Sequence, residues 1–265
     1  MELITSRRNP LVGRLRALHQ GRGRREQGLL LLEGTHQLQE LLRLGMRPEQ
    51  LLATPAWIER HGALLAACPL PPQPVGETVL AAVATTEHPD GVVATLAATA
   101  LPQASGRAGF VLALDQLQDP GNLGTLLRTA LAAGVEEVWI ADGADPLQPK
   151  VVRASSGAVL ALPVVRLDGE GLRQRLRDAR LRGRQLVATV VPGPGAGGAV
   201  PYWQLDWSAP TVLLLGNEGA GLSEELAAEA DRLVTIPHSP QVESLNVAVA
   251  AAPLLLERWR RSHAP

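Results

Sequence analysis

Apolar residues in the second half of the chain recur in two alternating patterns. Short apolar runs predict strands at 110–117, 137–141, 163–167, 185–191, 211–216 and 232–236. Helical spacing between them predicts helices at 123–133, 150–160, 170–182 and 223–230, and a long last helix from about residue 244. Strands that alternate with helices favour a mostly parallel sheet covered on both faces. We therefore expect an α/β domain over residues 110–265.

The first hundred residues mix the same patterns less regularly. Three leucines spaced by four and three positions, at 11, 15 and 18, predict a helix over Ser6–Arg25. Strands are predicted at 29–34, 50–54 and 91–97, with helices near 55–67 and 77–85. Thr35 is expected to be the N-cap of a further helix that ends before Gly45. These elements predict a small α/β domain over residues 1–100, and the polar stretch 101–109 is expected to be a linker.

Composition narrows the class of protein. The 265 residues are 46% hydrophobic with a formal net charge of −1, which excludes a uniformly basic nucleic-acid coat but not a local basic patch. The single cysteine, Cys68, excludes an internal disulfide framework and a cysteine zinc site. The first residues lack the apolar stretch of a signal peptide, and no apolar run approaches the roughly 18 residues that span a bilayer. We expect a cytoplasmic protein without a metal ion or a membrane partner.

A glycine motif after the strand at 185–191 resembles a dinucleotide-binding fingerprint. Gly193, Gly195 and Gly198 have the GxGxxG spacing, which needs a helix directly behind it to bind a pyrophosphate. Prolines surround these glycines, and the residues that follow lack helical apolar spacing. We interpret the segment as a flexible loop. A nicotinamide-dependent oxidoreductase therefore remains only a third hypothesis.

Three other segments carry candidate chemistry. In DPGNLGTLLRTALAAG (119–134), Asn122 lies where an N-cap belongs and Arg128 lies outside the apolar face, so a helix cap and a solvated charge are their simplest roles. In LLLGNEGAGLSEEL (213–226), a buried strand runs into three glycines and Glu218, an arrangement that suits a ligand site beyond the strand end. In the third segment, 236–261, Ser244 is predicted to begin the last helix with Asn246 in its first turn.

Taken together, these segments resemble the SpoU (TrmH) family of RNA ribose 2′-O-methyltransferases in the SPOUT superfamily. The family's motif series N-x-G-x-x-x-R, G-N-E-G-x-G and I-P … S-L-N-V occurs here in the same order. V-R-A-S-S-G-A at 152–158 and L-P-V at 162–164 are also similar to the family. Residues near the start, including ITSRRNPLV, resemble an L30e-like substrate-binding domain. The resemblance covers nearly the whole chain.

The resemblance implies a fold, a cofactor and a set of binding residues. The family's last segment threads through a loop to form a deep trefoil knot, and the loops of the knot hold S-adenosylmethionine. Carried over by position, the cofactor contacts fall on Gly216, Ile236 and Leu245, with Thr189 and Leu215 beside the adenine. The family is dimeric, so a homodimer is expected.

The implied reaction assigns roles to the polar residues of the motifs. A ribose 2′-hydroxyl is a poor nucleophile, so the enzyme must position it and stabilise the developing alkoxide. Arg128 suits this electrostatic role, because a guanidinium holds its proton too tightly to be a good general base. Asn122 is expected to orient Arg128 or the ribose. Glu218, Ser244 and Asn246 are expected to shape the pocket by hydrogen bonding.

Arginines near the start of the chain are candidate RNA contacts. Seven arginines and no acidic residue lie within Ser6–Arg25. A single one is as well explained by a solvated helix face, but the group favours phosphate binding. The assigned contacts are Arg7, Arg8, Arg22, Arg24 and Arg25. The substrate implied is 23S ribosomal RNA first and transfer RNA second.

The sequence departs from the family pattern in its last segment. His238 and Pro240 stand where the family commonly has Met and Gly, and they are expected to reshape the cofactor loop. Pro253 is expected to bend or break the last helix, at a cost of about 3 kcal/mol unless packing favours the kink. An alternative function follows from the same resemblance: a knotted RNA-binding protein that acts in ribosome assembly without catalysis.

Overall fold

A computed structural model describes residues 1–192 and 197–263. Its internal contacts divide the chain into two units, Met1–Pro102 with Asp145–Ala161, and Gln103–Ala144 with Leu162–Pro265. The chain therefore leaves the second unit after Ala144 and returns to it at Leu162. Each unit is described by itself. Within the described residues, every helix is too short or too polar to traverse a lipid bilayer.

The first unit is built on a mixed four-stranded sheet. Its strands are β1 (Leu29–Glu33), β2 (Gln50–Ala53), β3 (Gln73–Pro74) and β4 (Val92–Ala97), in the order β1-β4-β2-β3. β4 is antiparallel to β1 and β2, and β3 is parallel to β2. The helices are α1 (Pro10–Ala17), α2 (Gly21–Gln27), α3 (Thr35–Arg43), α4 (Pro55–Arg60), α5 (Gly62–Ala66) and α6 (Glu77–Val83), with a 3₁₀ turn at Ala98–Ala100.

Two local predictions for this unit are wrong. The predicted helix over Ser6–Arg25 is two helices, because the chain turns after Ala17 and α2 begins at Gly21. A Cβ on Gly23 would lie 2.0 Å from the carbonyl oxygen of Ala17, so the close approach of α2 to α1 requires glycine there. Thr35 is not an N-cap: Gly34 takes that position with φ 92°, and the Thr35 hydroxyl donates to Asp90 instead.

Residues 145–161 pack with the first unit, although the predicted boundaries place them in the second. They form α8 (Pro149–Ala154) and α9 (Ala158–Ala161) instead of one helix over 150–160, because Ser156 and Gly157 have φ values of 47° and 87°. Arg153 pairs with the buried Glu33 of β1 at 2.8 Å. Asp145 pairs with Arg24 at 2.5 Å. The ion-pair partners lie more than 100 residues away along the chain, so the local sequence pattern could not predict that residues 145–161 pack with the first unit.

The second unit contains the predicted parallel sheet. Its strands are β5 (Phe110–Asp115), β6 (Glu137–Ala141), β7 (Val164–Leu167), β8 (Gln185–Thr189), β9 (Val200–Pro201), β10 (Thr211–Leu215) and β11 (Arg232–Thr235). Within the described residues their order is β7-β6-β5-β10-β8-β11-β9, and every pair is parallel. This confirms the predicted α/β class. The carboxyl ends of adjacent parallel strands consequently lie along one edge of the sheet.

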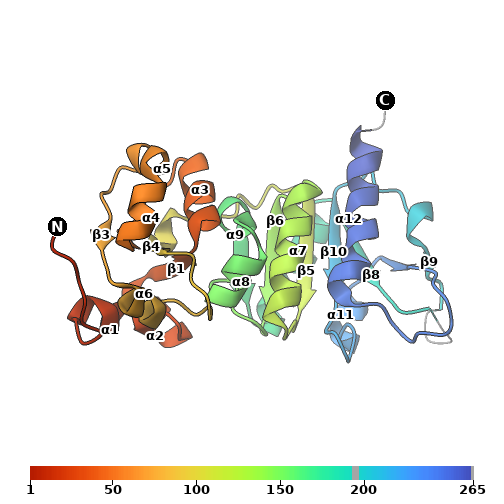
Figure 1. Cartoon of the computed structure of the whole chain (residues 1–265). Helices are drawn as coiled ribbons and strands as arrows, with labels where there is room; N and C mark the ends of the chain where they lie inside the picture. Colours follow the sequence, from red (N-terminus) through yellow and green to blue (C-terminus); the bar gives the residue numbers. More distant parts are fainter. Residues whose placement is uncertain (193–196, 264–265) are drawn as a thin grey trace. The chain divides into compact units, whose positions relative to one another are not determined.

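Helices cover this sheet. They are α7 (Pro120–Ala132), α10 (Gly169–Leu181), α11 (Glu224–Ala227) and α12 (Val247–His263), with a 3₁₀ turn at Tyr202–Gln204. Leu172, Leu176 and Ala179 of α10 pack into the core with apolar residues of the strands. α7 and α12 pack against each other (Figure 1).

Two predicted features of the later loops and helices have definite outcomes. Gly193 and Gly195 of the GxGxxG motif lie outside the described residues. Residues 200–204 form β9 and a 3₁₀ turn instead of the helix that a dinucleotide site needs. Pro253 neither ends nor interrupts α12. It removes a hydrogen bond to the carbonyl group of Val249, a residue that is 61% exposed and therefore accessible to water.

Candidate functional site

Three loops of the second unit meet beyond the carboxyl ends of its central strands. They follow β5 (residues 116–119), β10 (216–222) and β11 (236–246). Asn217 joins the first two loops, because its Nδ2 donates to the carbonyl oxygen of Gln116 at 2.8 Å. The three motif segments identified in the sequence are therefore neighbours in the structure.

Asn122 links all three segments through its side-chain amide. The predicted cap role belongs to Asp119, whose Oδ1 accepts from the backbone N–H of Asn122 at 2.8 Å while Pro120 takes the first helical position. The side chain of Asn122 is thereby available for tertiary contacts. Its Nδ2 donates to Oε1 of Glu218 at 3.2 Å, and its Oδ1 accepts from Nδ2 of Asn246 at 3.0 Å.

Glu218 binds the loop that starts α7. Its carboxylate accepts from the backbone N–H groups of Gln118 and Asp119 at 3.2 and 3.1 Å, in addition to Asn122. Partial burial acts to raise the pKa of Glu218, but these hydrogen bonds and its own backbone N–H together lower that pKa from 4.5. Glu218 is therefore an ionised acceptor at neutral pH.

The loop at 216–222 is closed so tightly that it requires glycine. Asn217 and Gly221 exchange backbone hydrogen bonds at 2.8 and 3.0 Å, and Gly221 has a φ of 72°. A Cβ on Gly216 would lie 2.1 Å from backbone atoms of Gly221 and Leu222. Gly216 consequently leaves its backbone accessible where any side chain would collide with the loop.

Asn246, and not Ser244, caps the last helix. Oδ1 of Asn246 accepts from the backbone N–H groups of Ala248 and Val249 at 2.9 and 3.2 Å, and α12 begins at Val247. The prediction that Ser244 begins this helix is wrong. Ser244 lies in the preceding loop instead, where it lines a cavity.

This cavity contains every residue that the sequence assigned to the cofactor. Thr189, Leu215, Gly216, Ile236 and Leu245 all line it. They come from the ends of β8 and β10 and from the loop after β11, which the parallel sheet brings to one edge.

The predicted catalytic residues divide between this cavity and its surroundings. Glu218 and Ser244 line the cavity. Asn122 and Asn246 are outside its lining, but Asn122 is hydrogen-bonded to Glu218 and to Asn246. Arg128 lies on α7, exposed and outside the cavity lining.

Residues without an assignment from the sequence also line the cavity. They include Val190, Val191, Asn217 and Glu243, and also His238, for which the sequence predicted an effect on the cofactor loop but no role in binding or catalysis. Nδ1 of His238 lies 2.7 Å from the carbonyl oxygen of Ile236. Each of them lies within two residues of a predicted cofactor residue along the chain, and that proximity is the signal that would have found them.

The candidate RNA contacts of the first unit differ in their accessibility. Arg7, Arg8, Arg22 and Arg25 are exposed. Arg24 is only 6% exposed and donates to the carbonyl oxygens of Leu18 and His19 as well as to Asp145. Its assignment as an RNA contact is therefore wrong, since its guanidinium is used inside the unit.

Known proteins resemble this chain over almost its full length. It is 45% identical over 268 residues to an uncharacterized tRNA/rRNA methyltransferase of Synechocystis, covering 98% of this chain and 94% of that protein. It is 33% identical over 257 residues to a 23S rRNA (guanosine(2553)-2′-O)-methyltransferase of Bacillus subtilis, covering 96% and 98%. The crystal structure of an AdoMet-bound rRNA methyltransferase from Sinorhizobium meliloti superposes with a TM-score of 0.84 at 34% identity, covering 100% and 99%.

Family models match both parts of the chain. The model of an MRM3-like substrate binding domain matches residues 9–94, where the sequence predicts a substrate-binding domain. The model of the SpoU rRNA Methylase family matches residues 109–256, more than half of the chain, and confirms the resemblance carried by the three motifs. The chain belongs to the SpoU rRNA methylase family.

Proposed function

We propose that this protein transfers a methyl group from S-adenosylmethionine to a ribose 2′-hydroxyl of RNA, with 23S ribosomal RNA as the first candidate substrate and transfer RNA as the second. One observation carries the proposal: all five residues assigned to the cofactor line a single cavity. That cavity adjoins the network of Asn122, Glu218 and Asn246. The relatives that carry this reaction in their names support the substrate class.

The cavity fits the chemical groups of the cofactor. Leu215, Ile236 and Leu245 offer an apolar surface for an adenine ring, and Gly216 offers backbone that no Cβ covers. Ionised Glu218 places negative charge at the cavity, which suits the cationic parts of the donor. S-adenosylmethionine supplies an activated methyl group on a sulfonium, so the protein has to orient the two reactants and exclude competing water.

Arg128 supplies the charge that the acceptor oxygen needs. A guanidinium stabilises the negative charge that develops on the ribose oxygen and binds an adjacent phosphate with its fork of donors. Asn122, Glu218 and Asn246 act as positioning residues that hold the start of α7 and the start of α12 beside the cavity. Ser244 contributes a hydroxyl to the cavity lining.

The homodimer and the trefoil knot belong to the same proposal. Leu131 of α7 and Val249, Leu256 and Trp259 of α12 are exposed apolar residues on two helices that pack together, and a second copy of the chain would cover them. Arg128 lies on this pair of helices and would then reach a site shared between subunits. Threading of the last segment through a loop is proposed because the chain belongs to the SpoU rRNA methylase family, whose last segment is expected to be knotted.

The first unit is proposed as the RNA substrate-binding domain of a cytoplasmic enzyme. The match to a substrate-binding domain over residues 9–94 supports this role. Its exposed arginines Arg7, Arg8, Arg22 and Arg25 supply positive charge for phosphates.

Two measurements on the purified full chain test the function. Calorimetry measures binding of S-adenosylmethionine, and transfer of labelled methyl groups is measured with a 23S rRNA transcript and with total tRNA. We expect cofactor binding and labelled ribosomal RNA. Tight RNA binding without cofactor binding or transfer would favour the alternative, a catalytically silent protein of ribosome assembly.

A further inference from the structure

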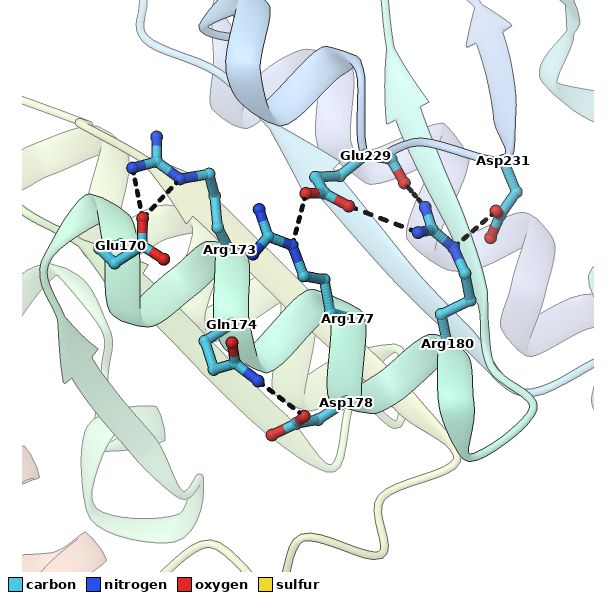
Figure 2. Close-up of polar contacts among 8 residues, drawn as sticks. All are labelled: Glu170, Arg173, Gln174, Arg177, Asp178, Arg180, Glu229 and Asp231. Carbon is cyan, nitrogen blue, oxygen red and sulfur yellow. Dashed lines mark hydrogen bonds and ion pairs between the residues drawn. The ribbon is translucent and has the colours of Figure 1, made fainter.

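Six arginines on and just after α10 fall into two groups. The first group is Arg173, Arg177 and Arg180. Figure 2 shows that each of these arginines forms an ion pair with at least one carboxylate. Arg173 pairs with Glu170 at 2.6 Å and Arg177 pairs with Glu229 at 2.9 Å. Arg180 pairs with both Glu229 and Asp231. Arg177 and Arg180 tie the helix to the segment before β11, whereas Arg173 pairs within the helix, and each of the three positive charges has a carboxylate partner.

The second group, Arg175, Arg182 and Arg184, lines a separate cavity with residues 104–106 and Trp139. Arg184 is 8% exposed and donates from Nε to the carbonyl oxygen of Ala108 at 2.6 Å. Nη1 of Arg182 and Nη2 of Arg184 both donate to the carbonyl oxygen of Gly106, at 2.9 and 3.1 Å. Two like charges therefore converge on a single neutral acceptor, an arrangement that an anion bound in the cavity would stabilise.

The carboxylates near this cavity are already engaged. Asp178 accepts from the side-chain amide of Gln174 at 3.0 Å (Figure 2). Buried Glu137 accepts from the backbone N–H of Gly106, the hydroxyl of Ser105 and the indole of Trp139. It also forms an ion pair with Arg175 at 3.8 Å, a distance too long for a hydrogen bond. Both carboxylates keep their negative charge, so among the described residues the three arginines exceed Asp178 in the lining and Glu137 beside Arg175 by one positive charge.

The guanidinium of Arg175 is positioned by stacking on Trp139, which leaves its N–H groups available as hydrogen-bond donors. Its guanidinium lies over the ring of Trp139, 5.0 Å from the ring centre, and no hydrogen bond from it to another described residue is formed. Stacking fixes the plane of the guanidinium without using its N–H groups. A preorganised guanidinium with unused donors is suited to bidentate binding of a phosphate.

We propose that this second cavity binds phosphate groups of the RNA backbone. It is built from residues that precede β5 and β8, so it lies at the opposite end of the parallel sheet from the cofactor cavity. A strand of five or six residues spans about 17–20 Å, a distance that a structured RNA covers easily. The inference rests on the proposed RNA substrate, and it adds a contact surface in the second unit to the arginines of the first.

The test compares two double variants of the full chain that each remove two positive charges. Arg175→Gln/Arg182→Gln changes the cavity, and Arg173→Gln/Arg177→Gln changes the matched group as a control. Binding of a 23S rRNA transcript is measured by filter binding at several salt concentrations. At about 0.15 M salt we expect the cavity variant to bind RNA about tenfold more weakly, and the slope of log affinity against log salt to decrease by about 1–2. The control variant is expected to stay near wild-type affinity.

The single variant Arg182→Glu separates an effect on RNA binding from an effect on folding. Arg175 lies beside buried Glu137, so its loss carries a risk to stability that thermal unfolding measures. Arg182 is exposed and its side chain makes one hydrogen bond, to Gly106, so Arg182→Glu alters the cavity charge without changing a contact of Glu137. We expect this variant to weaken RNA binding while its melting temperature and its affinity for S-adenosylmethionine are unchanged.

Equal RNA affinity in the cavity and control variants would overturn the proposal, even if methyl transfer by the wild-type protein is intact. Calorimetry with inorganic phosphate distinguishes a free anion from an RNA backbone. Phosphate binding that depends on Arg175 and Arg182, together with unchanged RNA affinity, would also overturn the RNA assignment. Absence of methyl transfer with cavity-dependent RNA binding would instead contradict the proposed function alone.

Discussion

At the scale of single residues, the geometry of the site depends on the hydrogen bonds that join the side chains of Asn122, Glu218 and Asn246. The sequence predicted Asn122 as a cap and Ser244 as the start of a helix, because both stand before apolar periodic segments. The actual caps are Asp119 and Asn246, three residues before and two residues after these positions. Which of several neighbouring polar residues caps a helix depends on the hydrogen-bond partners that the rest of the fold offers to each side chain. Asn122 is drawn away from the cap role by Glu218, which lies 96 residues later in the chain.

Replacement of Asn122 tests the positioning role. Asn122→Ala removes one hydrogen bond each from Glu218 and Asn246, so the free energy of unfolding should fall by about 1–2 kcal/mol. Chemical denaturation measures this loss. We also expect kcat for methyl transfer to fall while the RNA affinity is maintained. An unchanged kcat in a destabilised variant would show that the network is structural only.

Arg128→Ala tests the electrostatic role of the guanidinium. We expect methyl transfer to fall by about 100-fold or more, because the developing oxyanion loses its cation. The affinity for S-adenosylmethionine should be nearly unchanged, since Arg128 does not line the cavity. Equal losses of transfer and cofactor affinity would show that this role is wrong.

The ionisation of Glu218 predicts a pH dependence of stability. Its pKa in the folded protein lies below 4.5, so the carboxylate contributes stability that is fully present above about pH 4.5 and is lost as the pH falls through the folded value. Glu218→Gln should therefore be less stable than wild type at neutral pH, and the difference should shrink in acid. Thermal unfolding from pH 7 to pH 3 measures it. A difference that stays constant with pH would contradict this assignment.

At the scale of helices and strands, the alternation of patterns in the second unit was sufficient to locate most elements. β6 has the predicted bounds, β5, β7, β8, β10 and β11 differ from their predictions by at most two residues at one end, and β9 was not predicted. The order of the strands in the sheet could not be predicted from local pattern, because it depends on which strands pair with each other. The break after Ala17 was missed because the leucine spacing continues through it to Leu18.

The loop at 216–222 provides the test at this scale. Gly216→Ala places a methyl group against the backbone of Gly221 and Leu222, so the loop must open. We expect loss of S-adenosylmethionine binding in calorimetry, with cooperative unfolding retained. Gly219→Ala is the matched control, because the nearest atom to its Cβ is the side-chain oxygen of Asn217 at 3.7 Å. Equal cofactor affinity in both variants would show that the loop does not shape the site.

At the scale of the whole molecule, ion pairs between residues far apart in the chain determine the placement of residues 145–161, which the local sequence pattern did not predict. Asp145 and Arg153 anchor residues 145–161 to the first unit, although the chain enters and leaves this segment from strands of the second. The same pairing buries Arg24, which the arginine-rich pattern placed among the RNA contacts. Motif order, by contrast, picked out five residues that line one cavity, because each lies at the carboxyl end of a strand of one parallel sheet or in the loop that follows it.

The exposed arginines of the first unit are tested by charge reversal. Arg22→Glu/Arg25→Glu should weaken binding of a 23S rRNA transcript about tenfold or more, with a smaller dependence on salt. Arg24 is left intact because its reversal would break buried contacts. Cofactor affinity serves as the control and should not change. Unchanged RNA affinity at low salt would exclude these two side chains as contacts.

Ribose methylation in living cells provides the most direct test of the proposed activity. 2′-O-methyl positions are mapped across ribosomal and transfer RNA from cells that have this protein, from cells that lack it, and from cells that carry only the Arg128→Ala variant. One ribose in 23S rRNA is expected to be methylated only when the unaltered protein is present. Identical methylation maps in all three strains would contradict the assignment of a methyl-transfer site to the cavity beside Gly216 and Glu218.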